Sequence, residues 1–121
     1  MPRYTCSCCG YLVFESPGCY EICPICFWED DIVQSADPWF AGGANKPNLV
    51  DAQKCFLQYG AMEERFVSNV RKPIASDRKD PSWRMVQDTD KAYATTPRDI
   101  EENVSNGGTR VSYEYWIRSE A

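Results

Sequence analysis

Two closely spaced pairs of cysteines are the feature that most constrains the fold of this chain. Cys6 and Cys9 form one C-x-x-C pair, and Cys23 and Cys26 form a second, with residues 10–22 between them. Two such pairs at this separation are typical of a tetrahedral site made of four thiolates. The spacing therefore predicts that Cys6, Cys9, Cys23 and Cys26 bind one metal ion. Four protein ligands would close the coordination shell to water and substrate, which indicates a structural site.

The expected metal is Zn²⁺, and other uses of the cysteines stay open. Iron on the same four ligands would make an electron carrier. A redox C-x-x-C pair normally lies at the N-terminus of a helix, which lowers the pKa of one thiol, but neither pair precedes a clear helical pattern. Structural disulfides are disfavoured by the odd number of cysteines, which is 7, and by a reducing compartment.

The three remaining cysteines are expected to be ordinary thiols. Cys8 adjoins Cys9, so both can hardly bind the same ion without strain; the alternatives are that Cys8 replaces Cys6 or Cys9 as a ligand, or pairs with Cys19 on oxidation. Otherwise Cys8 and Cys19 are predicted to be small buried side chains. Cys55 is predicted to pack in the core, because a free cysteine behaves as a small hydrophobic residue.

Composition argues against an enzyme and against a nucleic-acid binder. The 121 residues include no histidine, which removes the commonest general base and the usual partner of a catalytic serine or cysteine. The net charge is −5, from 13 basic and 18 acidic residues, so contact with phosphate backbones is disfavoured and basic proteins are attracted. Basic residues cluster only in the stretch RKPIASDRK, residues 71–79.

No targeting segment is visible in the sequence. The opening stretch MPRYTCSCCG lacks the apolar segment of a secretory signal. No apolar run approaches the roughly 20 residues that a membrane span needs. We therefore expect a cytoplasmic protein with no membrane contact.

A candidate surface for a protein partner follows the second cysteine pair. The acidic run Glu29, Asp30 and Asp31 could attract basic groups, and Trp39 and Phe40 lie among turn-forming residues, where exposed aromatic side chains make good interface anchors. The alternatives are a solvated turn for the three carboxylates and packing in a small core for the two aromatic residues. The favoured reading is a non-enzymatic module that binds a basic protein, such as a toxin or a nucleic-acid enzyme.

The expected fold class is α+β. Residues 10–22 are predicted to form a β-hairpin that brings the two cysteine pairs together, as in a zinc ribbon or rubredoxin, and residues 29–48 to be mostly irregular. A helix is predicted from Asn48, a good N-cap, to Gly60, a natural left-handed stop. A second, shorter helix is predicted over residues 61–73, which would make a helical hairpin.

The remainder of the chain carries weaker signals. After a linker we expect a short strand at residues 83–87, a helix at residues 96–104 that begins at Thr96-Pro97, a turn at residues 105–108 and a strand at residues 109–117. The predicted organisation is a cysteine-rich unit with a helical hairpin over residues 1–73. A C-terminal extension over residues 74–121 is expected to pack on the same domain.

Three stretches of the sequence resemble the bacterial cysteine-rich CPCC domain family. They are CSCCGY at residues 6–11, CPICFWEDD at residues 23–31 and GGAN at residues 42–45, and the resemblance runs from about Tyr4 to about Pro73. Ser7 stands where the motif of the family has proline, which removes some turn rigidity but no candidate ligand.

The resemblance implies a small metal-bound domain without a settled activity. Chains that look like this are often encoded near toxin or mobile loci, so the sharpest form of the hypothesis is an immunity protein that neutralises a basic toxin such as a nuclease. The alternatives are a zinc-ribbon accessory protein that binds nucleic acid and a rubredoxin-like electron carrier.

Overall fold

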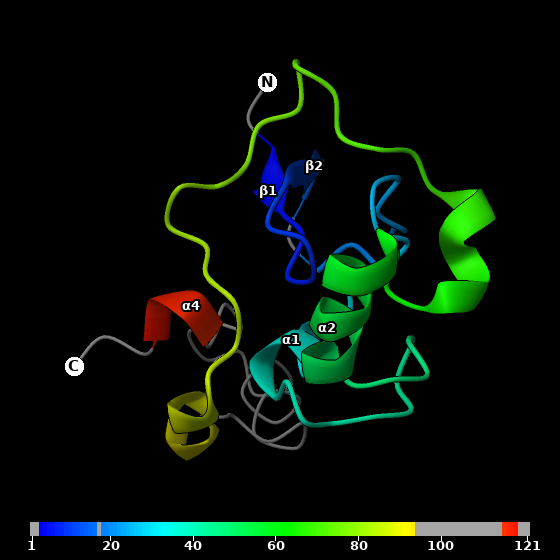
Figure 1. The fold of residues 1–121 in the computed structure, drawn as a ribbon. Helices are drawn as coiled ribbons and strands as arrows, with labels where there is room; N and C mark the ends of the chain where they lie inside the picture. Colours follow the sequence, from blue (N-terminus) through cyan, green and yellow to red (C-terminus); the bar gives the residue numbers. More distant parts are fainter. Residues whose placement is uncertain (1–2, 17, 94–114, 119–121) are drawn as a thin grey trace.

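A computed structural model of the chain describes residues 3–16, 18–93 and 115–118, and Figure 1 shows how its short elements are arranged. These residues form a two-stranded sheet, α-helices and two 3₁₀ helices. In chain order the elements are β1 (Tyr4–Thr5), β2 (Leu12–Phe14), α1 (Ile32–Ala36), α2 (Leu49–Tyr59), η1 (Glu64–Asn69), η2 (Asp88–Tyr93) and α4 (Tyr115–Arg118). The prediction of an α+β fold is therefore correct at this level.

The small sheet is antiparallel and encloses the first cysteine pair. Thr5 lies opposite Leu12 and Tyr4 opposite Phe14, with an irregularity in the register between Tyr4 and Thr5. The chain reverses between these strands through the turn that contains Cys6 and Cys9. β1 and β2 thus pair across the first cysteine turn.

The predicted hairpin over residues 10–22 is wrong. β2 pairs with β1, and Ile22 forms an isolated bridge with Glu29 on the other side of the second cysteine pair. Each C-x-x-C turn brings together the segments that flank it. β2 and Ile22 therefore pair across the two cysteine turns rather than with each other.

A segment distant in the sequence adds to the N-terminal hairpin. The chain between η1 and η2 runs back past β1 and β2 (Figure 1). There the N–H of Leu12 donates to the carbonyl of Arg78 at 2.8 Å, and the N–H of Asp80 donates to the carbonyl of Gly10 at 2.8 Å. Tyr11 and Lys79 form an antiparallel bridge between these two bonds.

Helix α2 agrees with its prediction at both ends. The side chain of Asn48 accepts a hydrogen bond from the N–H of Asp51 at 2.8 Å, which satisfies one of the free donors of the first turn. Gly60 ends the helix with φ +83°, and its N–H donates to the carbonyl of Phe56. Local capping chemistry therefore determines this helix.

The second predicted helix, residues 61–73, is wrong as an α-helix, because only Glu64–Asn69 is helical and its conformation is 3₁₀. Its ends are held by the second cysteine turn. The N–H of Met62 donates to the carbonyl of Cys26 at 2.7 Å, and the N–H of Arg71 donates to the carbonyl of Pro24 at 3.1 Å. The N–H of Arg71, used in this way, cannot donate within a helix, whereas that of Met62 would be free at a helix start and only fixes where the segment begins.

The region 29–48, predicted to be mostly irregular, contains helix α1. Asp31 caps this helix: its Oδ1 accepts from the N–H groups of Val33 and Gln34 at 2.8 and 3.2 Å. The helix is short because Pro38 follows it after one residue and the C-cap, Asp37, is already non-helical. The capping role of Asp31 was not part of the prediction.

The predicted strands of the C-terminal part are wrong where the structure describes them. Residues 83–87 are not a strand, because the N–H of Val86 donates to the side-chain Oε1 of Gln53 at 2.9 Å instead of to a neighbouring strand. Residues 115–117 belong to helix α4, in which the consecutive Tyr115 and Trp116 are both buried. The predictions for residues 96–104, 105–108 and 109–114 lie outside the described residues.

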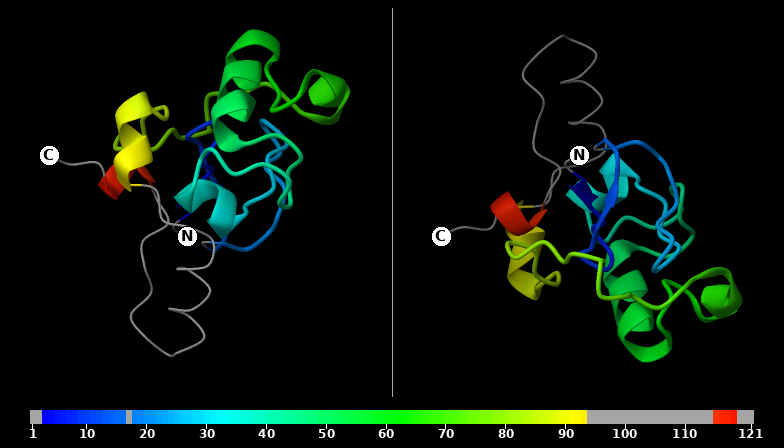
Figure 2. Two further views of the ribbon diagram at one scale, coloured as in Figure 1. Left: turned by 90° about the horizontal axis from the view of Figure 1, so that it is seen from below. Right: turned by 90° about the horizontal axis from the view of Figure 1, so that it is seen from above.

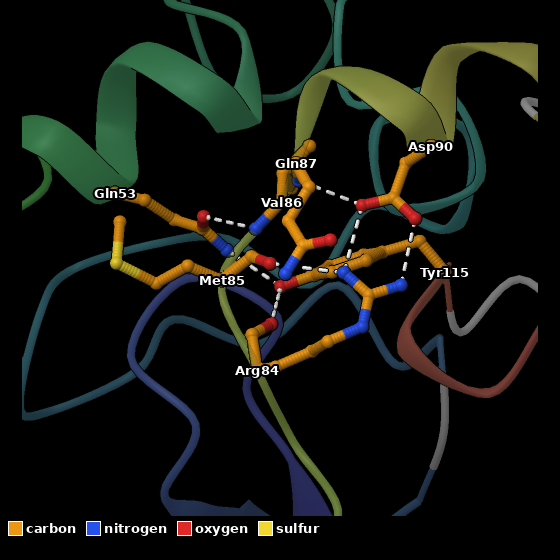
Figure 3. A network of polar contacts seen from close by, with 7 residues as sticks. All are labelled: Gln53, Arg84, Met85, Val86, Gln87, Asp90 and Tyr115. Atoms are coloured by element: carbon orange, nitrogen blue, oxygen red, sulfur yellow. Dashed lines mark hydrogen bonds and ion pairs between the residues drawn. The ribbon is translucent and has the colours of Figure 1, made fainter. Parts of the chain in front are cut away.

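A polar network joins the C-terminal elements to α2 (Figure 3). The hydroxyl of Tyr115 donates to the carbonyl of Arg84 at 2.5 Å and accepts from Nε2 of Gln53 at 2.7 Å. The guanidinium of Arg84 pairs with the buried Asp90 through contacts of 2.8 and 2.6 Å. Helix α4 lies beside η2 in both views of Figure 2.

The hydrophobic core is built around the cysteines. Side chains from both cysteine turns, α2 and α4 contribute to one buried cluster, whose largest members beside the cysteines are Phe14, Ile25, Trp28, Leu49, Met62, Tyr115 and Trp116. Across the described part of the chain, none of the helices has the length and apolar character that crossing a membrane requires.

Candidate metal centre

The two C-x-x-C turns have the same backbone hydrogen bonds. In the first, the N–H of Gly10 donates to the carbonyl of Cys6 at 2.8 Å; in the second, the N–H of Phe27 donates to the carbonyl of Cys23 at 2.9 Å. The N–H groups of Cys6 and Cys23 each donate to the carbonyl five residues ahead, at 2.9 and 2.8 Å. The two turns are therefore equivalent structures that face each other.

The residue after the second cysteine of each turn has a left-handed backbone conformation. Gly10 has φ +81° and Phe27 has φ +74°. Glycine adopts this conformation without steric cost, whereas for phenylalanine it is unfavourable. The side chain of Phe27 packs against Phe66, with ring centroids 4.5 Å apart. This contact gives phenylalanine a packing role that glycine could not supply at the same position.

The four predicted ligands converge at one point. The sulfurs of Cys6, Cys9, Cys23 and Cys26 all lie within 4.8 Å of one another, and all four residues are 0% exposed. The Cys6 and Cys26 sulfurs are 3.5 Å apart, and those of Cys9 and Cys23 are 3.8 Å apart. A tetrahedron with metal–sulfur bonds of about 2.3 Å has edges of about 3.8 Å, so the donor set fits a four-coordinate ion. These sulfurs are free thiols rather than disulfides.

Electrostatics also favours a cation among these sulfurs. Burial raises the pKa of Cys6 and of Cys26, whereas contacts from the neighbouring sulfurs, that of Cys26 first, lower the pKa of Cys23. Four buried thiolates without a counter-charge would repel one another in a medium of low dielectric constant. A bound divalent cation would allow all four to be ionised.

Ser7 links the first turn to the rest of the domain. Its buried hydroxyl is 2.7 Å from that of Ser35. Its carbonyl accepts two further hydrogen bonds, from Nε2 of Gln53 at 2.9 Å and from Nε1 of Trp83 at 3.0 Å. Sequence reasoning missed Gln53 and Trp83 as supports of this turn. The only signal was a glutamine inside the helix predicted between Asn48 and Gly60.

The other cysteines are free thiols as well. Cys8 is buried, and burial raises its pKa. Cys19 is half-buried and its thiol lies 3.6 Å from Oδ2 of Asp30. Cys55 is also half-buried, on α2. The four converging sulfurs described above do not include any of these three.

The predicted acidic patch is not an exposed patch, which corrects that part of the expectation. Asp30 is 1% exposed and its Oδ2 accepts from the N–H of Cys19 at 3.1 Å. Asp31 is 4% exposed; besides capping α1, it accepts from the N–H of Ala44 at 2.9 Å. Only Glu29 is partly accessible, so the run carries little negative charge at the surface.

The two aromatic residues of the predicted partner surface differ from each other. Phe40 is 37% exposed, whereas Trp39 is half-buried and has the ammonium of Lys91 5.7 Å from its ring centroid. Nearby, the amide of Gln34 donates to the carbonyls of Phe40, Asn45 and Pro47. The loop is thus held by buried amides that the sequence analysis did not single out.

The fold and the site together define a small α+β domain organised around a buried four-cysteine cluster that could hold a metal ion. A model of the cysteine-rich CPCC family matches residues 4–77, which is more than half of the chain. The chain therefore belongs to the cysteine-rich CPCC family, as its motifs suggested. A search of curated proteins finds no match.

Proposed function

We propose that Cys6, Cys9, Cys23 and Cys26 bind one Zn²⁺ ion and that this ion holds the domain together. The observation that carries the proposal is the convergence of four buried sulfurs at separations close to a tetrahedral edge. The two C-x-x-C turns have the same hydrogen bonds and together present four thiolates. Such a ligand set suits Zn²⁺, whose d electrons impose no coordination geometry of their own and which is commonly bound by four cysteines in structural sites. The ion would compensate the charge of the thiolates.

A structural role suits this site better than a catalytic one. Each candidate ligand is wholly buried, so water and substrate have no route to an open position. The chain has no histidine that could act as a base beside the site. The binding free energy of the ion would become folding free energy, because a ligand set of this kind does not exist in the unfolded chain.

Metal analysis of single variants tests this function. The wild-type chain should contain one zinc per molecule by elemental analysis, and Cys23→Ser should lose both the metal and the cooperative unfolding transition. Cys55→Ser is the matched control, because Cys55 lies away from the cluster, and it should keep both. A Cys23→Ser protein that retains a full zinc equivalent would refute the proposal. A red, iron-loaded wild-type protein would point instead to an electron carrier.

For the biological role, we propose a non-enzymatic module that binds a basic protein. The net charge of −5 supports attraction to such a partner, and an immunity protein for a basic toxin is the sharpest form of the idea. Because Asp30 and Asp31 are buried, the contact would depend on Glu29 and Phe40 and on other surface carboxylates. Co-expression with the products of neighbouring genes should yield a complex that dissociates as salt is raised. A salt-insensitive complex, or none, would contradict this role.

A further inference from the structure

A polar cavity lies beside the second cysteine turn, on the side of the molecule where the chain after η1 returns past the N-terminal hairpin (Figure 1). Its volume is about 630 Å³, within the range of small-molecule sites. The residues that line it come from four separate parts of the chain: Arg3, Leu12, Val13, Pro24, Arg71, Ser76, Asp77 and Arg78.

The cavity is basic, in contrast to the acidic chain that contains it. Three of its lining residues are arginines and one is an aspartate. The guanidinium of Arg71 already pairs with Asp77 through contacts of 2.7 and 3.0 Å, and this pairing holds the pKa of Asp77 near 2. Among the described residues, neither Arg3 nor Arg78 takes part in a salt bridge. The positive charge of Arg3 and Arg78 is therefore available to an anion.

The walls of the cavity are fixed by backbone hydrogen bonds. Arg71 is tied to the second cysteine turn, since its N–H donates to the carbonyl of Pro24 at 3.1 Å. Arg78 is tied to β2 through its carbonyl, which accepts from the N–H of Leu12 at 2.8 Å. Asp77 is held in turn by the N–H of Ile74 at 2.7 Å. The backbones of Arg71 and Arg78 are therefore held in position before any ligand binds.

The remaining wall is apolar. Leu12 and Val13 belong to β2, and Pro24 lies between the two cysteines of the second turn. The cavity as a whole is polar, and this apolar part of its lining would suit a ligand that carries an apolar body beside its charged group. An anion with no organic part would leave the apolar wall without a partner.

We propose that this cavity binds a small phosphorylated ligand with an apolar or aromatic body, of which a nucleoside monophosphate is the simplest example. The guanidinium fork matches the geometry of phosphate oxygens, so Arg3 and Arg78 would contact the phosphate. Pro24 and the part of β2 at residues 12–13, of which only one side chain can point into the cavity, would face the body of the ligand. A long polyanion is disfavoured, because the net charge of −5 repels it outside this one basic cavity.

The test is a titration of the folded, full-length protein with adenosine monophosphate, followed by two-dimensional NMR. Signals of Leu12, Val13 and residues 76–78 should shift together and saturate. Arg78→Gln and Arg3→Gln should each weaken binding about tenfold or more, since a charge-assisted hydrogen bond is lost. Lys54→Gln is the matched control: it removes the same charge from an exposed position on α2 and should leave the affinity unchanged.

Three further probes separate the sources of binding. Inorganic phosphate alone and adenosine alone should both bind more weakly than adenosine monophosphate, and a single-stranded oligonucleotide should bind no better per molecule. The proposal is overturned if adenosine monophosphate does not bind the folded protein, or if both arginine variants bind as the Lys54→Gln control does. It is also overturned if phosphate alone binds equally well, or if the oligonucleotide binds much more tightly. The spectrum of each variant before titration reports whether it is folded.

Discussion

Replacing Gly10 with alanine should destabilise the protein through two separable effects. Gly10 follows Cys9 in the first cysteine turn and has φ +81°. A Cβ atom at this position would lie 2.6 Å from Cδ2 and 2.6 Å from Cε3 of the Trp83 ring. The indole cannot withdraw freely, because its Nε1 donates to the carbonyl of Ser7 at 3.0 Å. Alanine therefore brings both a strained backbone and a steric clash.

The expected magnitude follows from adding the two effects. A left-handed conformation costs a residue with a Cβ about 1–2 kcal/mol. Overpacking against the fixed indole costs about 1–3 kcal/mol more. Gly10→Ala should thus lower the free energy of unfolding by about 2–5 kcal/mol. Gly60→Ala supplies the matched control, because Gly60 has φ +83° but no atom within 4 Å of the added Cβ, so it should cost only the first term.

Urea denaturation of both variants in the metal-loaded state measures the difference. Gly10→Ala should unfold at a clearly lower urea concentration than Gly60→Ala. It should also release a bound metal more readily to a chelator, because a backbone shift that relieves the clash would disturb the hydrogen bond from the N–H of residue 10 to the carbonyl of Cys6. Equal destabilisation of the two variants would show that Trp83 does not pack on the first cysteine turn, and would refute this account of the site.

Three more substitutions test other buried groups. Asp31→Ala removes the cap of α1 and should lower the free energy of unfolding by about 1–3 kcal/mol. An unchanged urea midpoint would show that Asp31 is not a buried cap but a solvated surface residue. Tyr115→Phe removes both hydrogen bonds of a buried hydroxyl, the one to the carbonyl of Arg84 and the one from Nε2 of Gln53, and should cost about 1–3 kcal/mol in the same assay; Tyr59→Phe, at an exposed position, should cost nothing measurable. Burial raises the pKa of Asp30, so the native state takes up a proton before the unfolded state does. The stability of the wild type relative to Asp30→Asn should therefore rise as the pH falls through this pKa toward the ordinary 3.8; a difference that does not vary with pH would contradict this.

The features that could be predicted from the sequence are those that local chemistry determines. The C-x-x-C spacing correctly predicted that Cys6, Cys9, Cys23 and Cys26 converge, because the main hydrogen bonds of each turn lie within its own short stretch of chain. Helix α2 was predicted for a similar reason, since its N-cap and its glycine stop lie at its own ends. In both cases the residues that make the prediction possible lie in the same stretch of chain as the turn or helix that they predict.

The errors arose where backbone groups bond to distant parts of the chain. Residues 61–73 have a helical pattern, but the N–H of Arg71 donates to the carbonyl of Pro24 in the second cysteine turn instead of within a helix. Residues 83–87 have the composition of a strand, but Val86 bonds to a glutamine side chain. The acidic run was read as a surface because carboxylates are rarely buried. Asp31 instead accepts from the N–H groups of Val33 and Gln34 in α1 and from the N–H of Ala44, and this last, distant donor cannot be identified from sequence.

The match to the family ends at residue 77, but the structural unit does not. Trp83 bonds to the carbonyl of Ser7 between two candidate ligands, and Tyr115 bonds to Gln53, which also donates to that carbonyl. Tyr115 and Trp116 belong to the same buried cluster as the cysteines. The part of the chain beyond the family match therefore acts on the first cysteine turn directly. Changes there should affect how firmly the turn is held, and so how tightly a metal ion binds, although none of these residues is a ligand.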